Sequence, residues 1–479
     1  MYVYKNKPIS TLLAVCLAQL IVALDMAVVN LALPSMSTAL GFAPVDLAWV
    51  VHAYALTFGG FLLLAGRAGD LYGRRRLFLG GLTAFAIASG LGGLAQEPWQ
   101  LITARAVQGI AAAIVAPSAL AMLTVTFPEG AARTRALGLW SGVNAVGGAL
   151  GVLAGGLLTE YVGWRWVMFV NVPIATGGLL LALLATSTDP RPARRGRLDV
   201  PGAVLATAGS GLLVLGVVRT DRLGWGSAPT IGTLLAAVAL LTAFLVLETR
   251  ASEPLVRLGL FSNRWVLGAN AFVFLAAAGQ FSAFYFVSLY LQQVLDWSAA
   301  TTGVAFLPFS AGTVAGVVLA TRLTSGSSPR GTLIAGSLLA ATGLGWFSLI
   351  DVAGTFVGNV LGPSLITSVG LGMCLGPVAA AALTGVRPAD AGMASGLLNS
   401  ARQLGGCIGL SSLATLAAHS AGHTPTPSRL TDAYALALTA AAAFLLLATV
   451  VALTVLPLTR HRRNPPVPDT ASTLEGAPS

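Results

Sequence analysis

Asp25 has the clearest potential for chemistry in this sequence, because it is an acid well inside a long apolar stretch. The other acidic residues fall in loops, near helix ends or in the C-terminal tail. A charged group at such depth in a membrane costs ~2.5–3.5 kcal/mol, so apolar packing does not account for it. A buried carboxylate can carry a proton, since its access to water and the charges around it determine its protonation. The alternative is a structural acid bonded to a polar neighbour such as Asn30.

Arg105 is the one basic residue expected at a comparable depth. With a rise of ~1.5 Å per residue, Asp25 and Arg105 lie roughly 12 and 9 Å from the outer ends of their helices. The two can therefore share a level in the membrane, where they would form a proton-coupling pair. The alternative for Arg105 is a side chain that extends to the outer membrane surface.

The sequence offers little sign of other reactive centres. Its cysteines, Cys16, Cys374 and Cys407, all lie in apolar segments, and it has no CxxC motif or His/Cys cluster. This pattern predicts neither disulfides nor a metal site, and no cofactor apart from a proton gradient. The net charge is +10, but the basic residues are spread over short loops, so a nucleic-acid partner is not expected.

Polar and aromatic side chains inside apolar segments could line a path for a substrate. These residues are Asn30, Tyr54, Gln108, Asn144, Gln280, Phe284, Tyr285, Asn399 and Gln403. One buried acid matches a multivalent cation poorly, so a neutral or singly charged, largely apolar substrate is expected. His52 lies near the outer end of its segment, where a structural hydrogen bond is a simpler role than proton relay.

The elements that position these residues are membrane helices. Of the 479 residues 56% are hydrophobic and 9% charged, and the mean hydropathy is +0.81. A soluble domain carries about 25% charged residues, and apolar runs of about 20 residues are long enough to cross a bilayer. Fourteen membrane helices are predicted, at 11–33, 46–66, 77–95, 99–122, 136–158, 164–186, 200–218, 229–248, 265–288, 299–320, 331–350, 355–384, 391–417 and 433–456.

Loop charge predicts the orientation of these helices. One set of loops holds most of the lysines and arginines, whereas the other set holds only Arg165, Arg219, Arg222 and Arg429. Because positive loops stay in the cytoplasm, both termini are predicted to be cytoplasmic. The bias persists to the C-terminal end, which supports the count of fourteen. Lys5 and Lys7 precede an apolar stretch too long for a signal peptide, which we interpret as an uncleaved first helix.

A weak internal repeat relates the two ends of the chain at an offset of 255 residues. Arg67 then falls on Arg322, Asn144 on Asn399, and Gly151 on Gly406. Repeated bundles with a binding site between them are typical of alternating-access carriers. The predicted organisation is an N-terminal six-helix bundle (1–190), two inserted helices with a basic linker (191–255), a C-terminal six-helix bundle (256–458) and a disordered cytoplasmic tail (459–479). Asp25 falls on Gln280, so proton coupling is expected in the first bundle.

The loop after the second helix has glycines on either side of an acid, followed by several bases. Its residues are Gly66, Asp70, Gly73, Arg74 and Arg75. This stretch resembles the conformational loop motif of the major facilitator superfamily, which pairs an acid and a base across the two bundles. The simple alternative is a loop whose bases only set topology. The corresponding loop of the second half has Ser325 in place of Asp70, so any such latch is one-sided.

Four further stretches resemble the fourteen-helix drug:proton antiporters of that superfamily. They are Leu24–Pro34, Arg105–Gly109, Trp164–Pro173 and Gly392–Gly405. The resemblance implies a monomeric, multi-pass carrier of the cell membrane that exchanges protons for drugs or toxic hydrophobic metabolites.

The fifth helix departs from the antiporter pattern. It carries Gly147, Gly151, Gly155 and Gly156, but Val152 stands where the family has proline after glycine. The glycines predict close helix packing, while the missing kink leaves the direction of transport open. A proton-coupled carrier for one endogenous metabolite is thus the nearest alternative. A membrane enzyme or a channel is less well supported, since the sequence has no nucleophile constellation, phosphate-binding loop or ion-filter repeat.

Overall fold

The computed structural model describes residues 7–43, 46–127, 131–185, 199–251, 254–324, 329–387, 390–422 and 426–457. Within these ranges the regular secondary structure is helical, and turns and loops join the helices. The first part of the chain forms α1 (Lys7–Leu40), α2 (Trp49–Tyr72), α3 (Arg74–Gly93), α4 (Pro98–Thr126), α5 (Ala131–Tyr161), α6 (Arg165–Phe169) and α7 (Asn171–Ala185). The remainder forms α8 (Val200–Leu223), α9 (Ala228–Arg250), η1 (Leu258–Ser262), α10 (Arg264–Leu289), η2 (Tyr290–Val294), α11 (Ala299–Ala305), α12 (Leu307–Thr324), α13 (Pro329–Phe347), η3 (Phe356–Leu361), α14 (Gly362–Leu383), α15 (Ala391–Ala421) and α16 (Pro427–Thr454).

These sequences form helices because backbone polar groups in a bilayer must be satisfied within the segment itself. Local signals set several of the starts. Ser227 and Thr426 accept hydrogen bonds from the backbone N–H three residues later, and a proline follows each within the first turn. Ser298 caps α11 in the same way. Each predicted segment has a helical counterpart, and its ends differ by a few residues.

Twelve helices of the described residues are long and apolar enough to cross a membrane. The helices α5 and α13 are outside that set, and among the described residues of α5 the stretch Val146–Tyr161 is apolar but shorter than a span. The structure therefore establishes an all-helical, multi-pass protein with about twelve spans.

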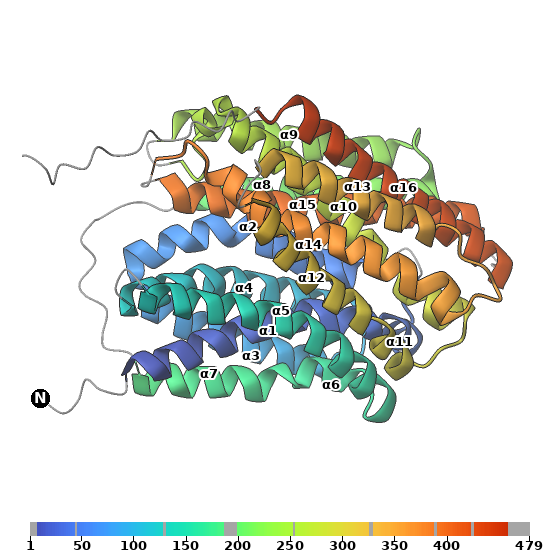
Figure 1. Cartoon of the computed structure of the whole chain (residues 1–479), viewed down its shortest axis with the longest axis horizontal. Helices are drawn as coiled ribbons and strands as arrows, with labels where there is room; N and C mark the ends of the chain where they lie inside the picture. The colour runs from blue at the N-terminus through green and yellow to red at the C-terminus, as the bar shows by residue number, and fades with distance from the viewer. Residues whose placement is uncertain are drawn as a thin grey trace, which may run out of the picture.

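The helices form two bundles that lie side by side (Figure 1). In the first, α1 packs against α4, α5 and α7, and α3 packs against α4 and α7. In the second, α10 packs against α14, α15 and α16, and α13 joins α14 to α16. The inserted helices α8 and α9 pack on each other, and α8 rests on both α2 and α15, so the pair lies where the bundles meet.

The internal repeat is visible in the helix boundaries. Shifting α3 by 255 residues gives 329–348, which matches α13 (Pro329–Phe347). The same shift places α1 over α10 with η2, α4 over η3 with α14, and most of α5 over α15. Equivalent helices therefore occupy equivalent positions in the two halves of the chain.

The two bundles share one apolar core at one end of the molecule, whereas toward the other end the first bundle has a core of its own and meets the second bundle through α2 and α15. Leu24 to Leu40 of α1 belong to the same buried cluster as α10, α14, α15 and α16, whereas Ala14 to Val22 belong to a second cluster within the first bundle. At the shared end, the Glu160 carboxylate accepts a hydrogen bond from the backbone N–H of Ala300, at 2.8 Å. This end contains the segment ends expected outside the cell, so the bundles close together there.

Candidate functional site

Asp25 lies fully buried in α1, and three side chains from two other helices surround its carboxylate. Arg105 Nη1 of α4 is 2.5 Å from Oδ2. Asn171 Nδ2 of α7 donates to Oδ1 at 2.8 Å, and Gln108 Nε2 of α4 donates to the same oxygen at 3.3 Å. The acid is thus paired with one charge and held by two amides, as a buried charge requires.

Arg105 is itself fixed by groups from α2. It is 2% exposed, its Nε donates to the backbone oxygen of Val50 at 3.1 Å, and its guanidinium lies 4.5 Å above the ring of Tyr54. Such stacking adds cation–π attraction, which is larger in a buried site such as this one. The predicted proximity of Asp25 and Arg105 is thus confirmed, and Arg105 does not reach for the membrane surface.

The network continues to α3 through Gln108. Its Oε1 accepts from Arg105 Nη1 at 3.0 Å, while its Nε2 donates to Ser89 Oγ at 2.6 Å. Gln108 and Ser89 are both fully buried. Four helices of the first bundle, α1, α3, α4 and α7, therefore contribute to one hydrogen-bonded group around Asp25.

Asn30 is not part of this group. Its Nδ2 donates to the backbone oxygen of Met26 in its own helix, at 2.9 Å, and its backbone oxygen accepts from Ser288 Oγ of α10 at 3.4 Å. Asn30 is therefore not a partner of Asp25, whose polar partners are Gln108 and Asn171, and it lies instead where the two bundles meet. Asn171 takes that role, although its only signal in the sequence is its place within the stretch Trp164–Pro173.

The other residues proposed for the substrate path have different surroundings. Gln280 is half-buried and forms no hydrogen bond with any described residue. Phe284, also half-buried, stacks on Phe306 with ring centres 5.4 Å apart and meets Phe309 edge-on at 4.7 Å. Asn399 is exposed, whereas Tyr285 is 3% exposed and packed in the core.

Gln403 and His52 lie between α2 and α15. Gln403 is 1% exposed, and neither atom of its amide has a hydrogen-bond partner among the described residues. His52 is fully buried, and its Nε2 lies 2.9 Å from Ser411 Oγ, which supports the structural role expected of it. Nothing is described of the Asn144 side chain.

The glycines of α5 allow two different close approaches. A Cβ at Gly151 would lie 2.7 Å from the backbone oxygen of Leu24, and one at Gly155 would lie 2.7 Å from that of Val28. Together with Gly147 they pack α5 onto α1, as predicted. Gly156 faces the other bundle, where Ala299 and Ala300 of α11 leave no room for a side chain.

The loop motif is a sharp turn at its centre. Gly73 has φ +99° and separates α2 from α3, and this conformation favours glycine. Arg74 starts α3, and Arg75 Nη2 donates to the backbone oxygen of Leu183 at 3.4 Å. Gly66 has room around it, with Pro117 3.8 Å from the position of a Cβ. The side chain of Asp70 is not among those described, so its pairing stays a prediction.

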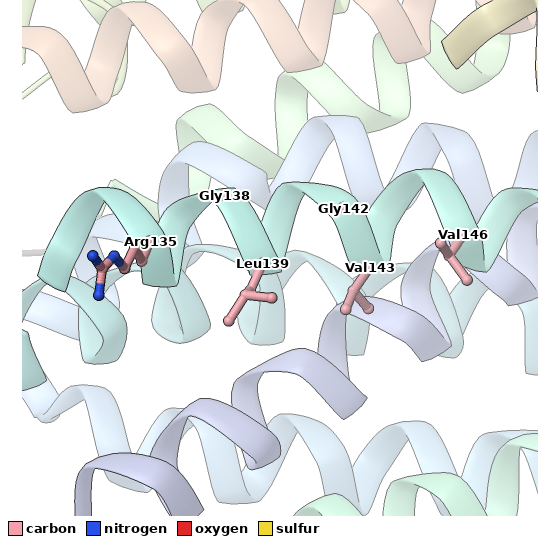
Figure 2. Close-up of a pocket in the computed structure, with 6 residues that line it drawn as sticks. All are labelled: Arg135, Gly138, Leu139, Gly142, Val143 and Val146. Carbon is pink, nitrogen blue, oxygen red and sulfur yellow. The ribbon is translucent and has the colours of Figure 1, made fainter. Parts of the chain in front are cut away.

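One hollow of about 690 Å³ lies along α5 and is lined by Arg135, Gly138, Leu139, Gly142, Val143 and Val146 (Figure 2). Its lining is apolar apart from Arg135. None of the described side chains expected on the substrate path lies there. By helical spacing this face of α5 points away from Gly151 and Gly155, which contact α1, and we assign it no role in transport.

Arg402 corrects the expectation that Arg105 is the one deep basic residue. It is the twelfth residue of α15, a helix of 31 residues, and it is half-buried. No described residue forms a hydrogen bond or ion pair with it. Its sequence position, well inside an apolar segment, was the signal for a second membrane-embedded cation.

The match to known families rests on most of the chain. Residues 15–410 match the family model described as Major Facilitator Superfamily. The chain belongs to that superfamily. It is therefore a multi-pass membrane transporter of small molecules rather than an enzyme, in agreement with the motifs of the sequence.

Two similar proteins are named after an antibiotic. The chain is 43% identical to the cephamycin export protein CmcT of Amycolatopsis lactamdurans, over 95% of this chain and 94% of that protein. It is 40% identical to the puromycin resistance protein pur8 of Streptomyces alboniger, over 92% and 90%. Among solved structures, the inward-open xylose transporter XylE of E. coli has a TM-score of 0.62 at 17% identity, over 95% of this chain and 98% of that one. The last likeness concerns the fold alone.

Proposed function

We propose that this member of the superfamily exports antibiotics or toxic hydrophobic metabolites from the cell in exchange for protons. The observation that carries the proposal is the fully buried Asp25–Arg105 pair. The antibiotic names of its relatives favour export of such compounds. A membrane-embedded acid with a defined partner is a functional site by default.

The mechanism assigns the proton to the Asp25 carboxylate. While Asp25 is ionised, Arg105 is held between that carboxylate, Val50 and the Tyr54 ring. A proton on Asp25 removes the ionic part of this bond, and Arg105 then rests on α2 and Gln108 alone. Because α1 and α2 also contact the second bundle, the change biases how the bundles are arranged.

The organisation that accompanies this function has fourteen membrane helices, with both termini in the cytoplasm. We assign residues 1–190 and 256–458 to the two bundles, 191–255 to the inserted pair with its linker, and 459–479 to a cytoplasmic tail. The helices α5 and α13 are the two spans beyond the twelve apolar ones, and their placement within the bundles favours this count. The transporter acts as a monomer, with substrate, protons and lipid as its partners.

Three further groups take supporting roles. The loop residues Asp70, Gly73 and Arg74 limit movement at the cytoplasmic end, and the α5 glycines keep α5 against α1 as the bundles rock. Gln280, Phe284, Asn399 and Gln403 face the substrate. The amides of Gln280 and Gln403 form no hydrogen bond with any described residue, whereas Asn399 Nδ2 donates to the Ser395 backbone oxygen and Phe284 stacks on Phe306.

Transport of puromycin in reconstituted vesicles tests the proposal. A proton gradient should drive puromycin against its own gradient in the wild type, and an uncoupler should abolish the movement. Asp25→Asn should lose this uphill transport but keep exchange of puromycin across the membrane, while Asp25→Glu should retain part of it. Uphill transport by Asp25→Asn at the wild-type rate would exclude Asp25 as the proton carrier.

Transport of one endogenous metabolite is the second candidate, and Val152 favours it. The residue leaves α5 without a proline among its glycines, so the helix has no proline kink. A growth-inhibition panel of chemically varied antibiotics separates the two. Protection against several classes favours drug export, whereas protection against none favours a dedicated metabolite carrier.

A further inference from the structure

We infer that Arg402 is the anion-binding residue of the substrate site, so that preferred substrates are largely apolar molecules with one acidic group. The inference deepens the proposed export function and rests on it. Its starting point is that Arg402 carries a positive charge inside the membrane with no described residue to balance it. Such charges in membrane helices face a cavity or pathway and mark where ligands bind.

The acids of the second bundle leave this charge uncompensated. Asp390, the nearest described acid along α15, already pairs with Arg257 at 2.6 Å and with Arg387 at 2.8 Å. In the first bundle, Asp25 is occupied by Arg105. An anionic substrate would supply the partner that the described part of the chain lacks.

The position of Arg402 on α15 places it beside the path between the bundles. Gly396, Ser400 and Cys407 mark the face of α15 that packs on α2, and Gly405 and Gly409 mark the face that packs on α10. With 100° per residue, Arg402 lies on the α10 face, between Gly405 and Gly406. It borders a stripe that turns from there toward α2 and contains Ser395, Asn399, Gly406, Leu410, Leu413 and Ala417.

Burial along this stripe changes from one end to the other. Leu410, Leu413 and Ala417 are 1%, 4% and 4% exposed, in the half where the bundles share a core. Asn399 is exposed and Arg402 is half-buried, toward the other end, where α15 meets α2 through Gly396 and Ser400. The stripe therefore opens toward the end expected in the cytoplasm, from which an exporter takes its substrate.

Contacts with α2 place Arg402 at a different level from Asp25. Ser400 Oγ donates to the backbone oxygen of Gly59, whereas Arg105 bonds Val50. Cys407 lies level with His52, so Arg402, two residues beyond Ser400, lies near the level of Thr57, about seven residues or ~10 Å from Val50. Arg402 thus lies on the cytoplasmic side of the proton pair, and substrate and proton can occupy separate sites.

One unused amide lies next to Arg402 and can complete an acidic group's hydrogen bonds. Gln403, the next residue of α15, has both amide atoms without partners among the described residues. Gln280 lies farther along, because the contacts of Gly405 with Phe274 and of Gly409 with Ala278 put it roughly 13 Å beyond the level of Arg402. Phe281 lies against Gly406 on the next turn of the stripe and offers an apolar surface. A guanidinium, a free amide and an aromatic ring are a suitable set for a hydrophobic carboxylate.

Binding of a matched pair of probes to the purified full-length protein tests the inference. Dansyl-phenylalanine carries a carboxylate, and its methyl ester is the neutral equivalent. The wild type should bind the acid more tightly than the ester by fluorescence titration. Arg402→Gln should weaken binding of the acid at least about tenfold and leave the ester unchanged, because a charge-assisted hydrogen bond is lost. Arg402→Lys should recover part of the affinity.

Arg322→Gln is the control for net charge, since Arg322 is exposed at the end of α12 in the same bundle. It should bind both probes as the wild type does. Equal affinity of the wild type for acid and ester, binding of neither, or equal weakening of both by Arg402→Gln would overturn the inference. Because binding is measured without a proton gradient, this result is independent of whether Asp25 couples protons to export.

Discussion

In the first bundle, the buried charges Asp25 and Arg105 form an ion pair, and three polar side chains complete it. At the repeat offset, Gln280 takes the place of the acid and Val360 that of the arginine in the second bundle. There Arg402 stands without a described partner, at a position where the first bundle has Gly147. The two bundles therefore share one fold but differ in their polar groups. The buried charges of the first bundle are paired with each other, whereas Arg402 and Gln403 of the second bundle have no described partner.

This difference separates two tasks that a coupled carrier must perform. A proton site needs a titratable group with a defined partner, so that protonation changes a bond inside the protein. A substrate site needs polar groups without internal partners, because the ligand supplies them. Two pairs of equivalent positions fit this division. The acid Asp25 of the first bundle corresponds to the neutral Gln280 of the second, and the neutral Gly147 of the first corresponds to Arg402 of the second.

Moving the acid to the equivalent position of the second bundle should have the largest effect. In the double variant Asp25→Gln with Gln280→Asp, proton-driven transport in vesicles should fall to the level of protein-free vesicles. The transferred acid has no arginine near it by repeat equivalence, since Val360 and Pro363 replace Arg105 and Gln108. Gln280→Asn alone is the control and should keep uphill transport. Activity of the double variant would show that the two bundles are interchangeable for protons.

The same substitution at the two deep arginines should separate a paired charge from an unpaired one. Arg105→Gln leaves the Asp25 carboxylate buried without its ionic partner, which costs about 3–5 kcal/mol. Arg402→Gln breaks no described bond and should change stability by at most about 0.5 kcal/mol. Denaturation midpoints of the purified variants in detergent give the comparison. Equal losses would mean that Arg402 has an internal partner.

Equivalent glycines should also differ between the halves. A Cβ at Gly151 would meet the backbone of Leu24, whereas one at Gly406 would meet the ring of Phe281, which can turn. We expect Gly151→Ala to cost about 1–3 kcal/mol through overpacking and Gly406→Ala to cost less. Gly148→Ala is the control, because its Cβ would have no atom within 4 Å. Thermal unfolding measures all three, and a harmless Gly151→Ala would contradict the close contact of α5 with α1.

The membrane helices could be predicted from the length of the apolar runs. The proximity of Asp25 to Arg105 could be predicted from the depth of each residue within its helix. Apolar runs of about 20 residues define spans, and depth along two helices puts two charges at one level. The contact of Asp25 with Asn171 could not be predicted, since it depends on how α7 crosses α1. Arg402 was detectable by the same depth argument, but its lack of a partner depends on packing that only the structure defines.

The smallest effect concerns the contact that closes the bundles at the outer end. The Glu160 carboxylate of α5 accepts from the backbone N–H of Ala300, in the first turn of α11. A negative charge at a helix start is favourable, and the exposed position limits its value. Glu160→Gln keeps the shape and removes the charge, so the outward-open population should rise by up to about fivefold. Spin labels at Val162 and Trp297 would report the larger outward-open population as a larger share of long distances between the labels.

Thr230→Val in α9 is the control, because Thr230 belongs to the cap at the start of a different helix. It should leave the distances between the labels unchanged. If Glu160→Gln also leaves them unchanged, the closing of the outer end depends on the shared apolar core and the Gly156 packing rather than on this hydrogen bond.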